Sequence, residues 1–253
     1  MTGSNLDRLP SIGLDEVLAR AELLNRNDRK YLVPYTTFER FLAGMRDRLS
    51  VLQIDGVRRF RYTSIYFDTP SLLTYHQHLQ RRRRRYKIRT RTYVDTSTCM
   101  LEVKMKGHRD ATDKRRISWP ARLAGQLTSD GERFAASVLN HELGLPLPRL
   151  ERTLRIDYQR TTLVSVDGAA RYTCDTGIRF VGRRGSADGP SDHVLIEVKS
   201  AGSKDPAHRL LWRLGVRPVQ MSKYPVAVAL LWPGIRANPW SRTIRRYFGV
   251  DSR

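Results

Sequence analysis

The chain has 253 residues, and its 40% hydrophobic and 28% charged content excludes a disordered chain, because enough apolar residues are present to form a core. Lysine and arginine number 46 against 25 aspartate and glutamate, which gives a formal charge of +21. Such an excess is costly in self-repulsion unless an anion offsets it, so nucleic acid, an anionic membrane and polyphosphate are the candidate partners.

The beginning of the chain is predicted to be mainly helical. Apolar residues with helical spacing predict a helix at residues 14–24, and we assign residues 1–24 to an N-terminal helix and tail. A short strand is expected at residues 30–33. The sequence Thr36-Thr37-Phe38-Glu39 resembles a capping box and predicts that a second helix begins there.

Alternating, strand-like segments dominate from residue 59 onward. Strands are predicted at residues 59–67, 86–93, 98–106, 114–119, 153–166, 171–180 and 193–199. Helices are predicted at residues 132–143 and, after a cap by Asp205-Pro206, at residues 207–214. Residues 182–192 have the composition of a flexible hairpin loop. Residues 25–235 then form the main domain, followed by a basic C-terminal tail at 236–253.

Location is predicted from what the sequence lacks. The two cysteines, Cys99 and Cys174, have no metal-type spacing and predict no disulfide framework. No signal peptide is recognised at the N-terminus, so the cytoplasm is the expected location. The most apolar run, residues 224–232, is shorter than the roughly 20 residues that span a bilayer, so no membrane span is expected on this chain.

The predicted strands each have one apolar and one charged face, because side chains alternate along a strand. The charged faces carry Lys87, Arg89, Arg91, Glu102, Lys104, Lys106, Lys114, Arg116, Tyr158, Arg160, Thr162, Arg171, Thr173, Asp175, Glu197 and Lys199. For a single strand, a solvated outer face is the usual outcome. A solvent face normally mixes both signs of charge, however, and gathered cations repel each other without a polyanion. The pattern favours an α+β fold: a closed antiparallel β-barrel of about eight strands with a cationic interior and helices packed outside.

The glutamates among these cations are candidates for a metal site. Oxygen ligands suit Mg²⁺ or Mn²⁺, which phosphoryl transfer requires. We interpret Glu197 first as a metal ligand and Glu102 first as an ion-pair partner, with the other role open for each. Asp28 and Asp68 lie next to strand ends and are interpreted as salt-bridge partners.

Residues 81–85 are five consecutive arginines. Such a run is usually a solvated loop or a nucleic-acid patch, and a funnel for phosphate is the alternative. The sequence has no P-loop, no dinucleotide-binding glycine motif and no nucleophile elbow.

Eight short segments occur along the chain in an order that points to one family. They are Arg29–Val33, Ser64–Thr69, Lys87–Arg91, Leu101–Lys104, Tyr158–Thr161, Arg171–Thr176, Ile196–Lys199 and Ser222–Tyr224. In this order they resemble the VTC (vacuolar transporter chaperone) polyphosphate-polymerase domain, over roughly residues 25–231. That family belongs to the triphosphate tunnel metalloenzymes, which share an eight-stranded antiparallel tunnel, and its eukaryotic members transfer the γ-phosphate of ATP onto polyphosphate.

The resemblance implies phosphate-binding roles for Lys30, Arg89, Arg91, Lys104, Arg160, Arg171 and Lys223. It also implies metal binding by Glu197 and a phosphate or nucleotide contact from Tyr158. Together with the strand alternation, it predicts that Lys30, Arg89, Arg91, Arg160 and Arg171 are catalytic. The predicted substrate-binding residues are Lys87, Lys104, Lys106, Lys114, Arg116, Tyr158, Lys199 and Lys223.

Two positions depart from the wider pattern. The superfamily's Glu-x-Glu-x-Lys motif reads Arg26, Asp28 and Lys30 here, a loss of glutamates that the polymerase family shares. Gln220 stands where a second lysine is expected, three residues before Lys223.

The predicted function is metal-dependent transfer of the γ-phosphate of ATP onto a polyphosphate chain in a cationic tunnel, with Mn²⁺ or Mg²⁺. One alternative is a triphosphate or nucleotide hydrolase of the same fold. The other is a non-enzymatic module that binds polyphosphate or RNA, with nucleic acid as the secondary candidate partner.

Overall fold

The computed structural model describes residues 4–20, 27–106, 112–200 and 205–249. It divides into two compact units, each built from three stretches of chain. The first unit comprises Met1–Phe60, Gln159–Gly177 and Pro190–Gln220. The second comprises Arg61–Tyr158, Ile178–Gly189 and Met221–Arg253.

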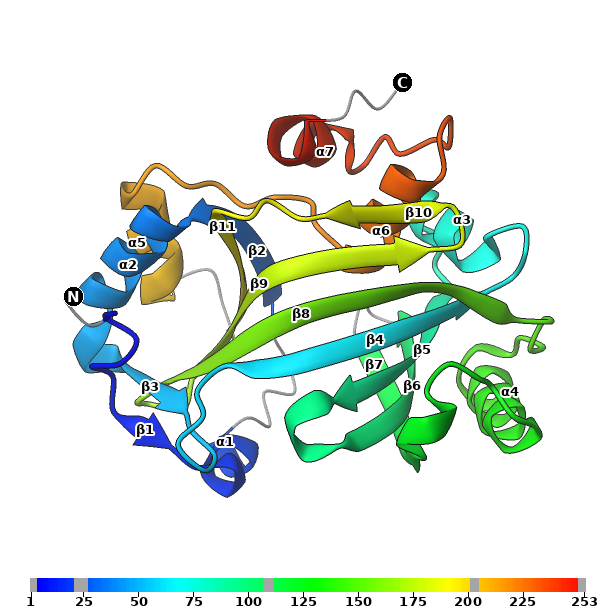
Figure 1. Cartoon of the computed structure of the whole chain (residues 1–253), viewed down its shortest axis with the longest axis horizontal. Coiled ribbons are helices and arrows are strands. Elements are labelled where there is room, and N and C mark those ends of the chain that lie inside the picture. Colours follow the sequence, from blue (N-terminus) through cyan, green and yellow to red (C-terminus); the bar gives the residue numbers. More distant parts are fainter. Residues whose placement is uncertain (1–3, 21–26, 107–111, 201–204, 250–253) are drawn as a thin grey trace. The chain divides into compact units, whose positions relative to one another are not determined.

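The first unit combines strands with two helices that cover one face of them. Its elements are β1 (Ser11–Ile12), α1 (Leu14–Arg20), β2 (Asn27–Pro34), α2 (Tyr35–Gly44), a 3-10 turn (Arg46–Arg48), β3 (Leu49–Leu52), β11 (His193–Ser200) and α5 (Pro206–Arg213). Parts of two long strands, β8 (Glu151–Ser165) and β9 (Ala170–Gly182), also belong to it. Figure 1 shows α2 and α5 side by side. Their apolar residues pack with one face of β2, β9 and β11, including Tyr31, Phe41, Tyr172, Ile196 and Leu211, to form the core of this unit.

The second unit has four consecutive antiparallel strands with a long helix on one face. Its strands are β4 (Phe60–Asp68), β5 (Arg85–Tyr93), β6 (Thr98–Lys106), β7 (Thr112–Trp119) and β10 (Gly185–Asp188). Its helices are α3 (Leu73–Leu79), α4 (Ser129–Leu143), α6 (Lys223–Leu231) and α7 (Ser241–Phe248), with 3-10 turns at Val94–Thr96 and Ala121–Leu123. Ile88, Leu101 and Val103 of the strands form a core with Ala135 and Leu139 of α4, which Figure 1 shows in green beside β6.

Eight strands are hydrogen-bonded in the order β2-β11-β9-β8-β4-β5-β6-β7. The pairs β2–β11, β11–β9, β4–β5, β5–β6 and β6–β7 are antiparallel. The α+β class and the eight-stranded antiparallel sheet are therefore confirmed. In the part of the chain that the structure describes, the order ends at β2 and at β7, so closure into a barrel stays a prediction.

The predicted capping box at Thr36 is wrong. Helix α2 begins at Tyr35, with Pro34 as its N-cap residue and no side-chain cap. The backbone N–H of Tyr35 donates to the carbonyl of Asp192 at 2.9 Å, so a distant carbonyl satisfies the first N–H of the helix in place of a capping side chain. The carboxylate of Glu39 instead accepts hydrogen bonds from Ser4 and Asn5.

Residues 182–192 are more ordered than their composition predicts. Strand β10 lies within this segment and pairs with the end of β9, with Gly182 opposite Gly185. Strands β1 and β3 and helices α3 and α7 were not predicted. The apolar run at residues 224–232 is largely helix α6. The helix predicted at residues 14–24 is described to Arg20, and its remainder lies outside the described residues.

Residues 236–253, expected as a basic tail, contain α7, in which Thr243 and Ile244 are buried. Both cysteines are unpaired and buried. Among the described residues, no helix is both long enough and apolar enough to cross a membrane.

Candidate functional site

Eight cations line one face of the second unit, and we call this group the cationic face. It consists of Arg85, Lys87, Arg89, Arg91, Lys104, Lys106, Lys114 and Arg116. The register places Arg85 opposite Lys106 and Lys87 opposite Lys104, so the cations form rows across neighbouring strands. Ile88 and Thr90 are buried on the other face, where Ile88 packs against α4, which confirms the predicted alternation of β5.

Glu102 is a carboxylate buried among these cations. Its side chain is fully buried and is bound by Arg89, with N–O distances of 2.7 and 2.8 Å, and by Lys114 at 3.5 Å. Burial alone would raise the pKa of Glu102, but Arg89, Arg91 and Lys114 hold that pKa well below its ordinary value. This pairing fits the ion-pair interpretation of Glu102.

The pKa values of Arg89 and Lys114 are shifted in opposite directions on the cationic face. Burial alone would lower the pKa of Arg89, but the adjacent Tyr66 and Glu102 hold it above its ordinary value. Burial, together with the neighbouring arginines, lowers the pKa of Lys114 despite the attraction of Glu102. This mutual repulsion on the cationic face favours the binding of an anion.

Two stacked tyrosine rings contact an arginine and a lysine of the second unit. The ring of Tyr62 stacks on that of Tyr158 at 5.3 Å between centroids. Arg91 lies over Tyr62 at 5.7 Å, and Lys223 lies over Tyr158 at 4.6 Å. The Nε atom of Arg91 is buried without a hydrogen-bond partner, so its cation–π contact with Tyr62 helps to hold the guanidinium in place.

Helix α6 brings further polar groups to the cationic face. Ser222, its N-cap residue, accepts a hydrogen bond from Lys87 at 3.0 Å. Tyr224 stacks on Tyr66, whose hydroxyl accepts a hydrogen bond from Arg89 at 2.8 Å. The start of α6 is thus fixed to β4 and β5 by side chains from three elements.

The interpretation of Asp68 as a salt-bridge partner is wrong. Its buried carboxylate accepts hydrogen bonds from the backbone of Thr69, Thr74 and Tyr75, from the Thr74 hydroxyl and from the Tyr224 hydroxyl. Burial and the nearby Asp68 carboxylate raise the pKa of Tyr224 well above its ordinary value, so that the phenol remains a donor. Asp68 therefore joins β4, α3 and α6.

The first unit carries a second charged face, with both signs of charge, which we call the mixed face. Glu197 is half-buried and contacts Lys199, and it lies 3.9 Å from Lys30. Lys199 also binds Asp28 at 3.2 Å, which confirms that Asp28 is a salt-bridge partner. Two carboxylates therefore converge on one ammonium group.

The arginines of the mixed face come from β8 and β9. Arg160 forms a bidentate pair with the buried Asp175, at 2.6 and 2.8 Å. In the register between β9 and β11, Arg171 lies opposite Lys199, and Thr173 lies opposite Glu197. These four residues therefore lie on the same face of the two strands. The alternation predicted for β9 and β11 is confirmed, because Tyr172, Cys174, Ile196 and Val198 are buried on the other face.

The described residues contain no group of three or more His, Cys, Asp or Glu side chains that could hold a metal ion. Mg²⁺, however, is usually bound by one or two carboxylates, with water and substrate phosphates supplying the rest. Glu197 and Asp28 offer such a pair, both on Lys199 and both partly accessible to solvent. This donor set fits a divalent cation that binds together with a phosphorylated substrate.

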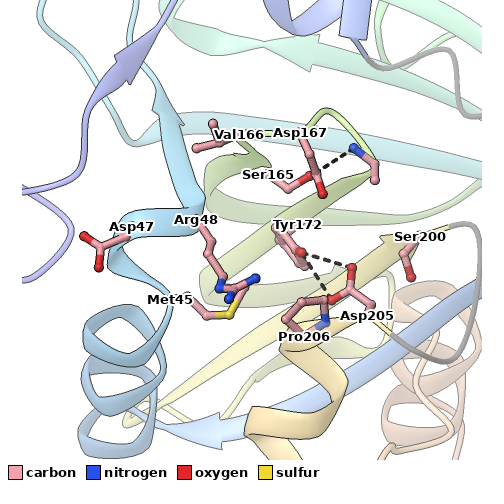
Figure 2. Close-up of a pocket in the computed structure, with 11 residues that line it drawn as sticks. Met45, Asp47, Arg48, Ser165, Val166, Asp167, Tyr172, Ser200, Asp205 and Pro206 are labelled. Atoms are coloured by element: carbon pink, nitrogen blue, oxygen red, sulfur yellow. Dashed lines mark hydrogen bonds between the residues drawn. The ribbon is translucent and has the colours of Figure 1, made fainter.

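A cavity of about 410 Å³ opens elsewhere in the first unit, at the ends of β8 and β9 (Figure 2). Tyr172 points into it and donates to Asp205, which caps α5 through the N–H of Ala207. Arg48 and Asp167 lie on its wall. None of the predicted phosphate-binding residues lines this cavity.

The predicted site residues lie in both units. Lys30, Arg160, Arg171, Glu197 and Lys199 belong to the first, and the remaining predicted residues belong to the second. Sequence reasoning missed Tyr62, Tyr66 and Ser222. Counting tyrosine as a polar residue in the alternation of residues 62–68 would have placed both tyrosines on the charged face.

Comparisons with known proteins identify the family and the fold of the chain. The model of the VTC domain family matches residues 25–232 of the chain. A comparison with curated proteins found no match. Among solved structures, HpAC1 from Hippeastrum, described as having a dominant triphosphatase activity, is 12% identical with a TM-score of 0.50, over 80% of this chain and 94% of that one.

Two further structures show weaker likeness. A proposed adenylate cyclase from Vibrio parahaemolyticus is 15% identical, with a TM-score of 0.42, over 79% of this chain and 95% of that chain. The PH1819 protein from Pyrococcus horikoshii is 14% identical, with a TM-score of 0.43, over 80% and 98%. The likeness to HpAC1 indicates a shared fold, and the family match covers most of the sequence. The chain belongs to the VTC domain family.

Proposed function

We propose that this protein transfers the γ-phosphate of ATP onto a polyphosphate chain in a metal-dependent reaction. The observation that carries the proposal is the cationic face, where eight lysines and arginines surround one buried carboxylate, Glu102. A chain of phosphates offsets this charge along its whole length, which a single phosphate does not. Membership of the VTC domain family supports the same chemistry.

We assign roles to the two faces separately. On the cationic face, Arg89 and Arg91 bind phosphate oxygens, and Lys87, Lys104, Lys106, Lys114 and Arg116 extend that binding along the sheet. Lys223 and Tyr158, in contact at 4.6 Å, add a cation and a ring from α6 and β8. On the mixed face, Lys30, Arg160, Arg171 and Lys199 also bind phosphate oxygens.

Glu197, with Asp28 beside it, is the residue that would hold a divalent cation, Mn²⁺ or Mg²⁺. When bound, that ion supplies charge neutralisation at the transferring phosphate. Lys199 contacts both carboxylates, so phosphate binding by Lys199 would free their oxygens.

The reaction needs no strong general base. A terminal phosphate of the polyphosphate chain is already an anion and attacks the γ-phosphorus in line, while the bond to ADP breaks and ADP leaves with that electron pair. The lysines and arginines orient both anions and neutralise the charge that develops, which is how most catalysis of phosphoryl transfer arises.

Incubation of the purified protein with ATP and Mn²⁺ or Mg²⁺ tests the proposal. We expect polyphosphate and ADP as products, and each is assayed separately from free phosphate. ADP with free phosphate alone would contradict the proposal in favour of a hydrolase of the same fold. Binding of polyphosphate without any turnover of ATP would favour a non-enzymatic module.

The variant Glu197→Gln tests the metal role. It keeps the shape of the side chain and removes its charge, so turnover should fall by at least about 100-fold. Binding of metal-free polyphosphate should stay the same or tighten, because a negative charge is removed from a basic protein. If Glu197 only pairs with Lys30 and Lys199, the melting temperature falls and turnover per folded molecule stays near that of the wild type.

A further inference from the structure

The arginine run that the sequence left unassigned forms an ordered turn between α3 and β5. We call Arg81–Arg84 the arginine turn, and all four side chains are exposed. Two backbone hydrogen bonds of 2.9 Å fix this segment: the N–H of Gln80 donates to the carbonyl of His76, and the N–H of Arg82 donates to the carbonyl of Gln77. Arg81 has a left-handed backbone with φ of 53°, as expected for a tight end to a helix.

The arginine turn carries uncompensated charge. In the described part of the chain, none of its four arginines forms an ion pair with a carboxylate. The side chain of Arg82 donates a hydrogen bond to the neutral side chain of Gln80 at 2.9 Å. Four exposed cations on one short turn attract a polyanion more strongly than any single phosphate.

This turn continues directly into the cationic face. Arg85 begins β5 opposite Lys106, and Lys87 follows opposite Lys104. Alternate residues of a strand lie about 7 Å apart, so cations are spaced evenly from the turn along β5. The two groups together form one cationic path on the second unit.

His78, in the last turn of α3, lies close enough to the cations at this end of the path for their charges to lower its pKa. Its Nδ1 donates to the carbonyl of Thr74 at 2.8 Å. Burial first, and then the charges of Lys87, Arg85 and Lys104, lower the pKa of His78 to about 2. The histidine therefore stays neutral, and the path does not carry an additional charge at this point.

We propose that the arginine turn binds the part of a long polyphosphate chain that extends beyond the cationic face. This inference rests on the proposed function for its ligand and concerns chain length. RNA is disfavoured, because binding of single strands uses exposed aromatic rings for base stacking. Residues 80–85 contain no aromatic side chain, and the adjacent Tyr86 is buried.

The triple variant Arg82→Gln, Arg83→Gln, Arg84→Gln tests this proposal in direct binding assays without ATP. Affinity for long-chain polyphosphate should fall at least tenfold, whereas affinity for tripolyphosphate should change less than twofold. For the long chain, the magnitude of the slope of log affinity against log salt concentration should fall by about two. Each phosphate of a single-stranded polyanion that the protein neutralises contributes roughly 0.7 to that slope, and the variant removes three arginines. The Arg→Lys triple variant should keep most of the affinity, because it keeps the charge.

A matched control removes equal charge from another exposed surface of the same unit. Arg242, Arg245 and Arg246 lie on α7, and their triple Arg→Gln variant should bind long polyphosphate within twofold of the wild type. Melting temperatures identify any variant that fails to fold. If the Arg→Gln triple variant fails, Arg83→Gln is compared with Arg245→Gln, and only Arg83→Gln should lose affinity for the long chain. If the α7 variant loses as much affinity for long polyphosphate, the loss depends only on the net charge of the protein, and the proposal is overturned.

Two other outcomes would also overturn it. If tripolyphosphate loses as much affinity as the long chain, the arginine turn belongs to the short-substrate site. If RNA of matched length loses affinity and polyphosphate does not, the turn is a nucleic-acid surface. Because these assays contain no ATP, they give a result even if ATP-dependent synthesis of polyphosphate is not observed.

Discussion

Glu102 is fully buried and bound by Arg89 and Lys114, so removing its charge should destabilise the protein. Glu102→Gln leaves the cations without a counter-charge, and a broken buried pair costs about 3–5 kcal/mol. Urea unfolding at neutral pH measures this change. Glu142→Gln, which removes a pair with the exposed Arg115, is the control and should leave stability close to that of the wild type.

The same residue predicts a pH dependence. The pKa of Glu102 is lower in the folded protein than the value of about 4.3 in an unfolded chain. Its stabilising contribution is therefore complete above that unfolded value and is lost as the pH falls toward the lower folded pKa. The wild type should lose stability below about pH 4 more steeply than Glu102→Gln. The measurement is the free energy of unfolding as a function of pH for both proteins. If it falls with the same slope below about pH 4 in both, Glu102 does not have the lowered pKa in the folded protein.

At the scale of elements, Asp68 fixes the start of α6, where Ser222 and Lys223 reach the cationic face. Five hydrogen bonds converge on its carboxylate. Asparagine keeps only one of the two carboxylate oxygens that accept these hydrogen bonds, so Asp68→Asn leaves buried donors unpaired. Each unpaired group costs about 1–3 kcal/mol, and the free energy of unfolding should fall by about 2–4 kcal/mol.

Tyr224→Phe is the matched variant for Asp68. It removes one donor and keeps the ring that stacks on Tyr66 at 4.9 Å, so it should cost about 1 kcal/mol. Chemical denaturation measures both losses, and affinity for tripolyphosphate measures whether α6 stays in place. If Asp68→Asn weakens neither stability nor affinity, Asp68 does not position α6.

At the scale of the whole molecule, the formal charge of +21 predicts stabilisation by polyanions. A ligand that binds only the folded state raises the melting temperature by mass action. Tripolyphosphate and polyphosphate should raise it more than monophosphate at the same concentration of phosphate groups, because several cations then share one ligand. Sodium chloride at matched ionic strength is the control, and equal shifts from all three phosphates would contradict a multi-phosphate site.

The sequence by itself determined the charged and apolar faces of the strands. In YKIRTRTY and LEVKMK the alternation is strict, and strand geometry sends alternate residues to opposite faces whatever the neighbours are. The order of the segments also determined the family, which the match at residues 25–232 confirms. Periodicity of this kind is local, so it is visible without a structure.

Contacts between distant segments were decided only by the tertiary structure. Asp68 lies beside Tyr224, 156 positions away, and neither residue indicates its partner in the sequence. The first N–H of α2, that of Tyr35, is satisfied by the carbonyl of the distant Asp192, which the local capping signal at Thr36 does not indicate. Tyr62 and Tyr158 stack because β4 and β8 are neighbours, and a tyrosine on a strand is equally compatible with a core position or with a charged face.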